Sequence, residues 1–325
     1  MTGQDLALNR IWYPVLRSDA LGEGPISVPL LDEKIVLFRT KQGVHAFRDL
    51  CIHRGVPLSL GKVAGDELVC AYHGWRYNGC GQCTRIPSLS ADQAIPAKAR
   101  AFAYACREAR GIIWVCPGSP EGAHPLVDAA LEEGCKQICM GPYAIRAAGP
   151  RVIENFLDIS HFMFVHEGLL GDGAFPEIED YRVREEEGVI RSDEIAVYQP
   201  DPDGTGRGVY SRYVYEIHHP FCAAFTKRTG GTGEFMGLYL ALLPEADNQS
   251  TAFMVMERNY LLEEPDEVFI RFQDLLIEQD RLMLENQKPE LLPLDLQAEL
   301  HLKCDRISIA YRQKLREWGV TFGTD

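Results

Sequence analysis

Two short segments that each hold one cysteine and one histidine constrain the fold of this chain more than any other feature. Cys51-Ile-His53 is followed, after sixteen intervening residues, by Cys70-Ala-Tyr-His73. Each pair fits on one tight loop and can present its side chains to a common centre. In a chain of 325 residues, paired cysteines with nearby histidines are more typical of a metal site than of disulfides. The sequence therefore predicts an N-terminal domain that holds two loops around a metal centre.

Two kinds of centre use two cysteines and two histidines. One is a tetrahedral zinc ion, and the other is a two-iron, two-sulfur cluster with both cysteines on one iron and both histidines on the other. Zinc fingers usually group Cys with Cys and His with His, whereas here each loop supplies one of each. Gly55 and Gly74 follow the two pairs, and glycine leaves backbone N–H groups free to approach cluster sulfides. The pattern favours the iron–sulfur cluster, with these four side chains as its ligands.

The first ~115 residues consist of short strand-like segments broken by turns, which predicts a small all-β domain. A stretch rich in Gly and Pro, Pro117–Pro125, is typical of a linker, and His124 within it is expected to be exposed. We therefore expect two domains, residues 1–120 and 121–325. The N-terminal strands are expected at Ile26–Leu31, Lys34–Arg39, Val44–Phe47, Leu68–Tyr72 and Gly111–Cys116.

The second domain mixes helices with strands, which predicts an α+β fold whose helices pack against an antiparallel sheet. Pro265 opens a long helix that runs to about Gln287, with Asp266 and Glu267 in its first turn. The other helices are expected at about Val152–Val165 and Asp305–Trp318, and strands at Gly208–His218, Phe235–Leu243 and Thr251–Met256.

One acid and two histidines, Asp158, His161 and His166, lie in the mostly apolar segment of the first predicted helix. Asp158 and His161 share a helix face, whereas His161 and His166 lie about 140° apart around a regular helix. Both histidines can bind one ion only if a π-bulge or a helix break lies between them. Two histidines also need a carboxylate to complete the open, three-ligand site of iron oxygenases.

Asp280 is the best candidate for this carboxylate. It interrupts an apolar stripe on the long helix that includes Phe269, Phe272, Leu276 and Met283. A carboxylate buried without a partner costs several kcal/mol, so Asp280 needs either a metal ion or a cationic partner. The histidine pair upstream favours the metal over an arginine partner or a capping role.

The two patterns together resemble the Rieske non-haem iron oxygenases, and the match covers nearly the whole chain. The resemblance implies an all-β Rieske domain followed by a catalytic domain with a helix-grip fold. It also implies that His161, His166 and Asp280 bind a mononuclear Fe(II), with O₂ as co-substrate. Asp158 would bridge His161 to a Rieske histidine of a neighbouring subunit. Asn155 is as much a candidate for a place near the iron as for a structural role.

A reaction and partners follow from the same resemblance. The chain would be the terminal oxygenase of a monooxygenase system that hydroxylates a C–H bond of a small organic molecule, and O- or N-demethylation begins with the same attack. No GxGxxG motif opens a helix, so electrons must come from a separate NAD(P)H-dependent flavin and iron–sulfur reductase, or from a ferredoxin. Relatives of this length that lack a small β-subunit form homotrimers, so the resemblance implies a homotrimer. The alternative from another class is a Rieske electron-transfer protein with a non-catalytic second domain.

Three stretches carry the likeness within the family: Leu68–Asn78, Asp158–Gly168 and Ala310–Thr321. They resemble vanillate and dicamba demethylases, toluenesulfonate methyl-monooxygenase and, most of all, the hydroxylases of saxitoxin biosynthesis. Monooxygenation is favoured over cis-dihydroxylation, with an aromatic, polycyclic or alkaloid-like substrate. The pocket is expected between the helix that bears Asp280 and the strands from about Val209 to Met256. Aromatic candidates for its lining are Tyr210, Tyr213, Tyr215, Phe221, Phe225 and Tyr239.

Composition and charge exclude other functions. The net charge of −14 argues against nucleic acid, whose phosphates would be repelled. No apolar run approaches the ~20 residues of a membrane helix, and the N-terminus lacks the pattern of a secretory signal, so a cytoplasmic protein is expected. Cys80 and Cys83 have redox or metal spacing but no second pair nearby, and they are expected to be ordinary thiols.

Overall fold

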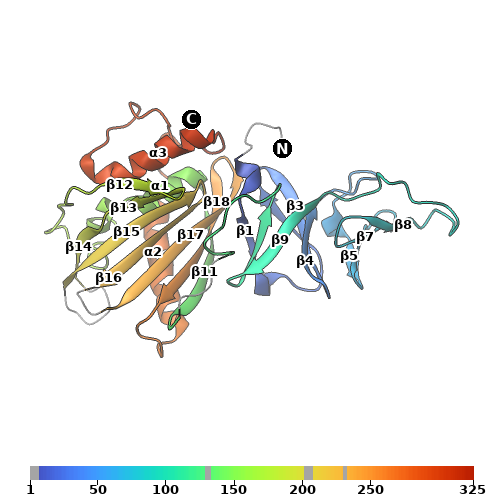
Figure 1. Cartoon of the computed structure of the whole chain (residues 1–325), viewed down its shortest axis with the longest axis horizontal. Coiled ribbons are helices and arrows are strands. Elements are labelled where there is room, and N and C mark those ends of the chain that lie inside the picture. Colours follow the sequence, from blue (N-terminus) through green and yellow to red (C-terminus); the bar gives the residue numbers. More distant parts are fainter. Residues whose placement is uncertain (1–6, 129–132, 201–207, 230–232) are drawn as a thin grey trace. The chain divides into compact units, whose positions relative to one another are not determined.

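The structure is a computed structural model that describes residues 7–128, 133–200, 208–229 and 233–325. Its internal contacts divide the chain into two units, Met1–Ala123 and His124–Asp325 (Figure 1). Among the described residues, no helix combines the length and the apolar character needed to cross a membrane.

The N-terminal unit is built from antiparallel strands in two sheets. The larger sheet has the order β1-β10-β9-β4-β3-β2, and the smaller sheet has the order β5-β6-β7-β8. Ile35–Phe38 in β3 and Ile112–Cys116 in β10 are fully buried, so these apolar runs form the centre of the unit. The strands are β1 (Tyr13–Arg17), β2 (Ile26–Leu30), β3 (Glu33–Thr40), β4 (Gly43–Arg48), β5 (Lys62–Ala64), β6 (Glu67–Val69), β7 (Arg76–Asn78), β8 (Cys83–Arg85), β9 (Ala103–Ala109) and β10 (Ile112–Cys116).

The second unit is organised around one antiparallel sheet of order β11-β18-β17-β16-β15-β13-β12, with β14 paired to β15. Side chains of β15 alternate between buried and less buried positions, as expected for a strand with one face on a core. The strands are β11 (Lys136–Ile145), β12 (Val183–Glu186), β13 (Val189–Ser192), β14 (Ile195–Gln199), β15 (Val209–His219), β16 (Cys222–Thr229), β17 (Phe235–Ala246) and β18 (Gln249–Arg258).

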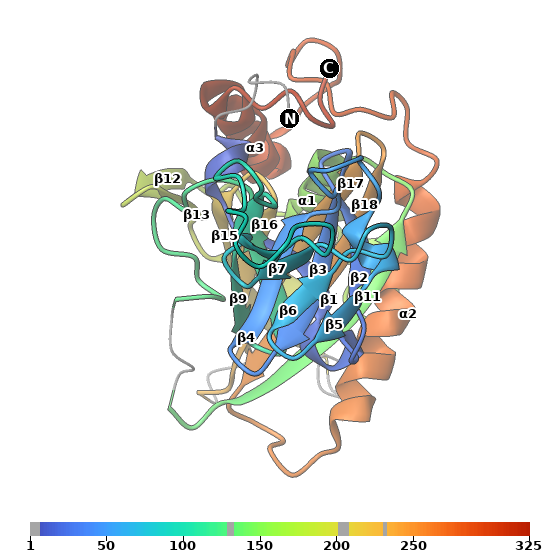
Figure 2. The ribbon, with the colours of Figure 1, turned by 90° about the vertical axis from the view of Figure 1, so that its right-hand side faces the viewer.

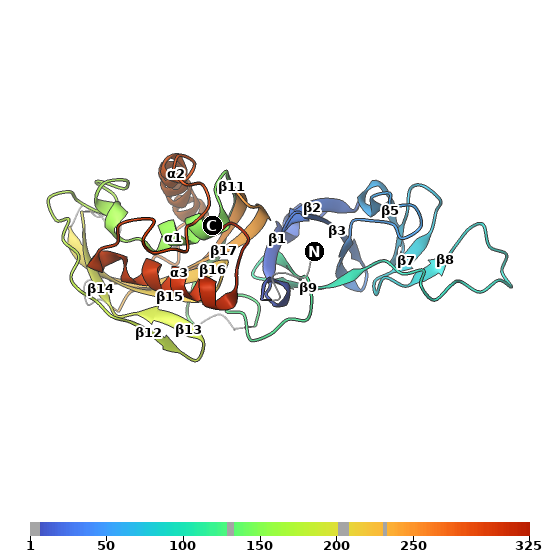
Figure 3. The same ribbon diagram turned by 90° about the horizontal axis from the view of Figure 1, so that it is seen from above.

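Three helices accompany this sheet: α1 (Gly149–Leu157), α2 (Asp266–Leu284) and α3 (Arg306–Trp318). Helix α1 packs against β16 and β17, α2 runs beside β11, and α3 lies against β12 and β13 (Figure 2). Because α1 also contacts both other helices, the three form a row with α1 in the middle (Figure 3). Helix α3 ends at Gly319, whose φ of 69° supplies the left-handed conformation of a C-terminal cap.

Two sequence predictions about this unit are wrong. The helix predicted over Val152–Val165 ends at Leu157 and resumes only as a short 3₁₀ turn, Ser160–Met163. His124, expected to be exposed, is only 3% exposed. Its ring lies 5.0 Å from that of His219, so it belongs to the core of the second unit rather than to a solvated linker.

Candidate active site

The two loops that carry the Cys/His pairs share one backbone frame. In the first loop, the Cys51 N–H donates to the carbonyl of Val56 at 2.8 Å, and the Gly55 N–H donates to the carbonyl of Cys51 at 2.9 Å. In the second loop, the Cys70 N–H donates to the carbonyl of Trp75 at 2.9 Å, and the Gly74 N–H donates to the carbonyl of Cys70 at 3.0 Å. Gly55 and Gly74 have φ values of 71° and 69°, which glycine adopts without strain. The loops are therefore two copies of one tight turn.

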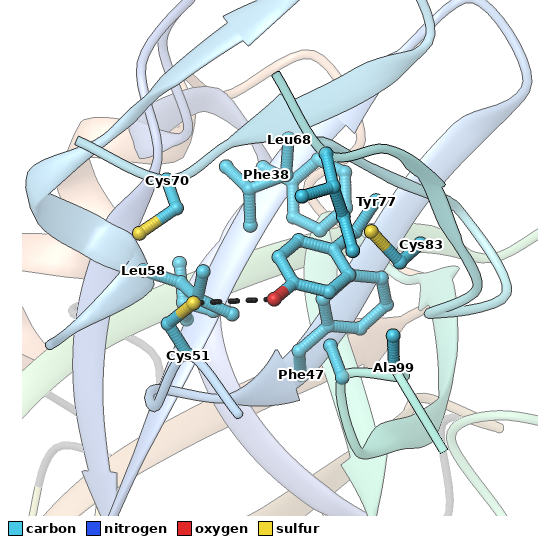
Figure 4. Close-up of a cluster of buried hydrophobic side chains, with 12 residues drawn as sticks. Phe38, Phe47, Cys51, Leu58, Leu68, Cys70, Tyr77, Cys83 and Ala99 are labelled. Carbon is cyan, nitrogen blue, oxygen red and sulfur yellow. Dashed lines mark hydrogen bonds between the residues drawn. The ribbon is translucent and has the colours of Figure 1, made fainter. Parts of the chain in front are cut away.

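The four candidate cluster ligands divide by depth. Cys51 and Cys70 are each 2% exposed and lie side by side at the base of the loops (Figure 4). His53 is half-buried and His73 is exposed, with their ring centroids 4.5 Å apart. Nδ1 of His53 is buried and has no hydrogen-bond partner among the described residues. Two buried thiols beneath two imidazoles fit a cluster that has one iron on cysteines and the other on histidines.

Tyr77 connects this base to the core of the unit. Its hydroxyl lies 3.1 Å from Sγ of Cys51, and its ring is fully buried. Burial raises the pKa of Tyr77, so its hydroxyl stays protonated and can donate to the sulfur. Cys83 lies on the other side of the Tyr77 ring, away from the cysteine pair, and Cys80 is exposed (Figure 4). Neither thiol joins the four candidate ligands.

The second constellation depends on the early end of α1. Asp158 takes an extended conformation, and its Oδ1 accepts hydrogen bonds from the Ser160 N–H at 2.8 Å and the Ser160 hydroxyl at 2.6 Å. A short acidic side chain that bonds the backbone two residues onward competes with the helix and starts a new turn. This is the helix break that the five-residue spacing of His161 and His166 requires.

The break brings His161 and His166 to Asp280 on α2. Oδ1 of Asp280 lies 3.5 Å from Nε2 of His161 and 3.2 Å from Nε2 of His166. Bonds of about 2.1 Å to one ion, roughly at right angles, would place two ligand atoms about 3 Å apart. Both nitrogens of His161 and Oδ1 of Asp280 are buried without a hydrogen-bond partner in the described structure. Two imidazoles and a carboxylate so arranged fit a mononuclear non-haem Fe(II).

The outer nitrogens of these imidazoles face hydrogen-bond acceptors. Nδ1 of His166 lies 2.8 Å from Oε1 of Gln279, so it must carry the proton and leave the lone pair on Nε2. Nδ1 of His161 lies 3.6 Å from Oδ2 of Asp158. Burial raises the pKa of Asp158, but His161 and the bonds from Ser160 outweigh burial and lower it overall. The carboxylate therefore stays ionised and favours the same tautomer in His161.

A second buried group, His124, His219 and Cys222, has donor atoms close enough to suggest another metal site. Burial lowers the pKa of both histidines, that of His124 to about 3, so both rings are neutral. Their Nδ1 atoms accept backbone N–H bonds from Leu126 at 3.1 Å and Phe221 at 3.3 Å. The remaining proton of each ring must then sit on Nε2, which leaves no lone pair there for a metal. The protons on these Nε2 atoms therefore make this group unsuitable as a metal site, unlike the group of His161, His166 and Asp280.

A cavity of about 520 Å³ opens beside His161, His166 and Asp280. Its walls are mainly apolar, which is typical of a pocket for a small organic molecule. Helix α2 follows the cavity from Val268 to Leu284. Among the apolar residues of the wall are Phe156, Phe162, Leu240, Met254, Met256 and Phe269.

The expected pocket lining is only partly correct. Of the six aromatic candidates, Tyr213 and Phe225 line the cavity. The other four do not: Tyr215 and Phe221 are fully buried in the core, Tyr210 is 53% exposed and Tyr239 is half-buried. The residues missed include Lys227, Met236, Tyr260 and Gln273, and Asn155 at the end of α1 also reaches the cavity.

Most of the expected stripe on α2 faces the cavity, because Phe269, Phe272, Leu276 and Asp280 all line it. Phe272 and Met283 are 38% and 44% exposed, whereas Gln273 and Ile277 are buried. The helix turns the side that includes Leu276 and Ile277 towards the interior, which leaves Met283 on the outer surface. Asp280 nevertheless remains directed inward, with its side chain 14% exposed.

Comparisons with known proteins match both units. Residues 11–102 match the Rieske [2Fe-2S] domain, and residues 145–321 match the vanillate O-demethylase oxygenase C-terminal domain. The chain is 30% identical to methylxanthine N1-demethylase NdmA of Pseudomonas putida, over 95% of this chain and 89% of that protein. The chain belongs to the Rieske non-haem iron oxygenases.

A solved structure and a further relative agree with this assignment of the chain to the Rieske oxygenases. The solved structure of NdmA from Pseudomonas putida CBB5 has a TM-score of 0.81 and 30% identity, covering 95% of this chain and 90% of that one. The oxygenase component of dicamba O-demethylase from Stenotrophomonas maltophilia is 28% identical over 72% of this chain and 68% of its own length. These matches confirm the predicted fold class and the terminal oxygenase, with its Rieske cluster and mononuclear iron. Like its family, it works with a separate reductase or ferredoxin and a small-molecule substrate.

Proposed function

We propose that Cys51, His53, Cys70 and His73 hold the Rieske cluster of this oxygenase. The main support for the second centre is that the Nε2 atoms of His161 and His166 lie 3.5 and 3.2 Å from the same carboxylate oxygen of Asp280. These three side chains would hold the mononuclear iron at one end of the cavity.

With both groups bound, the cluster supplies electrons one at a time and the iron supplies open positions for O₂. The protein's own residues do the rest. Asp158 and Gln279 orient the two imidazoles through Nδ1. The apolar cavity wall excludes water and holds the substrate beside His161 and His166. Overall, a C–H bond, O₂, two electrons and two protons give a C–OH group and water.

The working unit we propose is a homotrimer. Asp158 would then link His161 to a Rieske histidine of a neighbouring subunit. The Asp158 side chain is 35% exposed although its Oδ1 is bonded to Ser160, and exposed His73 offers a matching donor on the other unit. Sedimentation that gives a stable monomer with full activity would contradict this arrangement.

For the reaction, we propose hydroxylation of a C–H bond, and N- or O-demethylation is the form that the relatives favour. Demethylases named for methylxanthines, vanillate and dicamba all match this chain. Hydroxylation of an N- or O-methyl group gives an unstable product that releases formaldehyde. The likeness to saxitoxin-pathway hydroxylases and the cytoplasmic location stay predictions.

The proposal is tested by iron and acid-labile sulfide per chain on anaerobically purified protein, with an EPR spectrum after reduction. Three irons, two sulfides and a Rieske signal are expected. His161→Ala should lose one iron and keep the sulfides and the signal. His219→Ala is the matched control. It removes a buried histidine from the group of His124, His219 and Cys222, whose protonated Nε2 atoms cannot bind a metal. Two irons per chain, unchanged by added Fe(II) or by His161→Ala, would overturn the assignment.

A further inference from the structure

The hydroxyl group of Tyr213, in the wall of the cavity, has only part of its hydrogen-bonding capacity in use. Tyr213 on β15 lines the cavity and is 1% exposed. Its oxygen accepts a hydrogen bond from Nε2 of Gln199, the last residue of β14, at 2.9 Å. A phenol carries one proton to donate as well as lone pairs with which to accept. The bond from Gln199 therefore leaves the proton of Tyr213 unused.

The carbonyl of Leu170 fixes the direction in which the Gln199 amide points. Nε2 of Gln199 donates to this carbonyl at 3.0 Å as well as to Tyr213, so both of its protons are used. With the amide reversed, Oε1 would face the carbonyl oxygen of Leu170, and two acceptors would repel each other. The Tyr213 oxygen must therefore receive a proton from Gln199 instead of giving one to it.

This arrangement leaves two neighbouring buried groups unmatched. Gln199 is fully buried, and its Oε1 has no hydrogen-bond partner in the part of the chain that the structure describes. The Tyr213 hydroxyl likewise donates to no described residue. A buried donor or acceptor left unpaired destabilises a fold, and a reversed amide would pair these two with each other. Because Leu170 prevents that reversal, the Tyr213 proton stays available to a molecule in the cavity.

The constraint on Gln199 comes from the segment that holds a candidate iron ligand. The Leu170 N–H donates to the carbonyl of His166 at 3.0 Å, and the Leu170 carbonyl accepts from Gln199. The turn after His166 thus reaches the cavity hydroxyl through one glutamine side chain. Leu170 and Gln199 act as positioning residues for Tyr213.

Tyr213 lies within reach of a molecule that also contacts the metal residues. Its ring centre is 5.8 Å from that of Phe162, which is 5.8 Å from that of His166. One aromatic side chain therefore separates the tyrosine from the histidine, and the cavity of about 520 Å³ has room for a small ring system between them. Burial raises the pKa of Tyr213, so its hydroxyl keeps the proton.

We propose that the substrate carries a carbonyl oxygen that accepts a hydrogen bond from the Tyr213 hydroxyl. This inference rests on the proposed function and names the substrate class of that site. A carbonyl accepts without bringing a further donor, which the mainly apolar wall would leave unpaired. Tyr213 would then fix how an otherwise apolar ring system is turned towards the metal residues. An analogue that lacks the oxygen leaves the buried donor unpaired and is disfavoured.

The test compares aromatic ketones with isosteres that lack the oxygen, by equilibrium dialysis against the anaerobic holoenzyme. The pairs are 1-indanone and indane, 9-fluorenone and fluorene, and 4-methoxyacetophenone and 4-isopropenylanisole. For at least one pair, Tyr213→Phe should weaken binding of the ketone about 2- to 12-fold, the factor of one net hydrogen bond, and leave binding of its isostere unchanged. Isotope-edited infrared spectra should show the carbonyl stretch of the bound ketone at lower frequency in the unmodified enzyme than in Tyr213→Phe.

Tyr215→Phe is the control for the loss of a buried hydroxyl. Tyr215 lies two residues further along β15, and its ring stacks on that of Tyr213 with the centres 6.0 Å apart. It is fully buried but does not line the cavity. Tyr215→Phe should therefore leave both affinities and the carbonyl frequency unchanged. Iron and sulfide content verify that each variant is folded and loaded.

The outcomes separate this inference from the proposed function. The inference is overturned if none of the three ketones binds, or if Tyr213→Phe alters neither ketone affinity nor the carbonyl stretch, even when the enzyme turns over. An equal effect of Tyr215→Phe would also overturn it, because the hydroxyl would then act through packing. Conversely, ketone binding that depends on Tyr213, in a protein that lacks the third iron, would uphold the hydrogen-bond site and contradict the oxygenase assignment.

Discussion

Nδ1 of His166 lies 2.8 Å from Oε1 of Gln279, while Nε2 of the same ring lies 3.2 Å from Oδ1 of Asp280. Two consecutive residues of α2 therefore hold one imidazole from both sides. Gln279 sets the tautomer, and Asp280 joins the ring at the candidate iron position. The helix thus contributes an orienting residue as well as a candidate ligand.

Replacement of Gln279 should weaken iron binding without touching a ligand. In Gln279→Leu, we expect iron affinity to fall about 10- to 100-fold, as for other residues that orient metal-bound histidines. Titration of Fe(II) into protein that retains its cluster measures this. Gln279→Glu keeps an acceptor at Nδ1 and should retain most of the affinity. Equal loss in both variants would mean that Gln279 acts only through packing.

The hydroxyl of Tyr77 should set the potential of the cluster. A donor to Sγ of Cys51 stabilises the more negative, reduced state, so Tyr77→Phe should lower the reduction potential. A net hydrogen bond of about 0.5–1.5 kcal/mol corresponds to roughly 20–60 mV for one electron. Redox titration followed by EPR gives the value. Tyr104→Phe, which removes a hydroxyl bonded to Glu33, should leave the potential unchanged.

Two substitutions of Asp158 should separate its local and electronic roles. Asn keeps an oxygen for Ser160 and so preserves the turn, whereas Ala removes both that acceptor and the charge. In Asp158→Asn, we expect full iron occupancy but cluster reoxidation at least tenfold slower in single-turnover stopped flow. Asp158→Ala should in addition lose iron. Normal reoxidation in the Asn variant would remove Asp158 from the electron path.

Arg312 should be essential for the stability of the second unit. It is 2% exposed and bonds both carboxylate oxygens of Glu154, at 2.5 and 2.8 Å, as well as the carbonyl of Pro293 at 3.0 Å. Arg312→Met leaves the carboxylate of Glu154, which is 13% exposed, with only the longer 3.5 Å contact to Arg151, so the free energy of unfolding should fall by about 3 kcal/mol. Arg306 lies on the same helix and forms an exposed ion pair with Asp180. Arg306→Met should therefore lower the free energy of unfolding by less than about 1 kcal/mol. Denaturant unfolding of both variants provides the comparison.

Much of the fold was predictable because residues that typically begin or end helices and strands lie at the boundaries of these elements. Pro265 with Asp266 and Glu267 predicted the start of α2, and the strands expected at Gly208–His218 and Phe235–Leu243 correspond to β15 and β17. The strand expected to reach Tyr72 ends at Val69, because Cys70 already belongs to the turn closed by Gly74. The motif spacing also predicted that His161, His166 and Asp280 belong to one site, and the structure places both imidazoles within 3.5 Å of the Asp280 carboxylate.

The remainder depends on contacts between segments far apart in sequence. The end of α1 at Leu157 follows from a side-chain bond of Asp158, which competes with a helical pattern that the apolar residues support. The Gly and Pro residues around His124 predict an exposed side chain, yet its ring packs on His219. Lys227 was detectable as a charge on the same strand face as Phe225, but only the packing of α2 opposite shows that this face lines a cavity.

The rigidity of α2 has a consequence for regioselectivity. Val268 and Asp280 both line the cavity, and a helix fixes their separation at roughly 18 Å along its axis. A molecule that fills the cavity therefore presents to the candidate iron position the carbon that its own length and shape place there, rather than its most reactive carbon. Of two isomers with the same methyl group on different ring positions, we expect one to be turned over and the other to bind as an inhibitor.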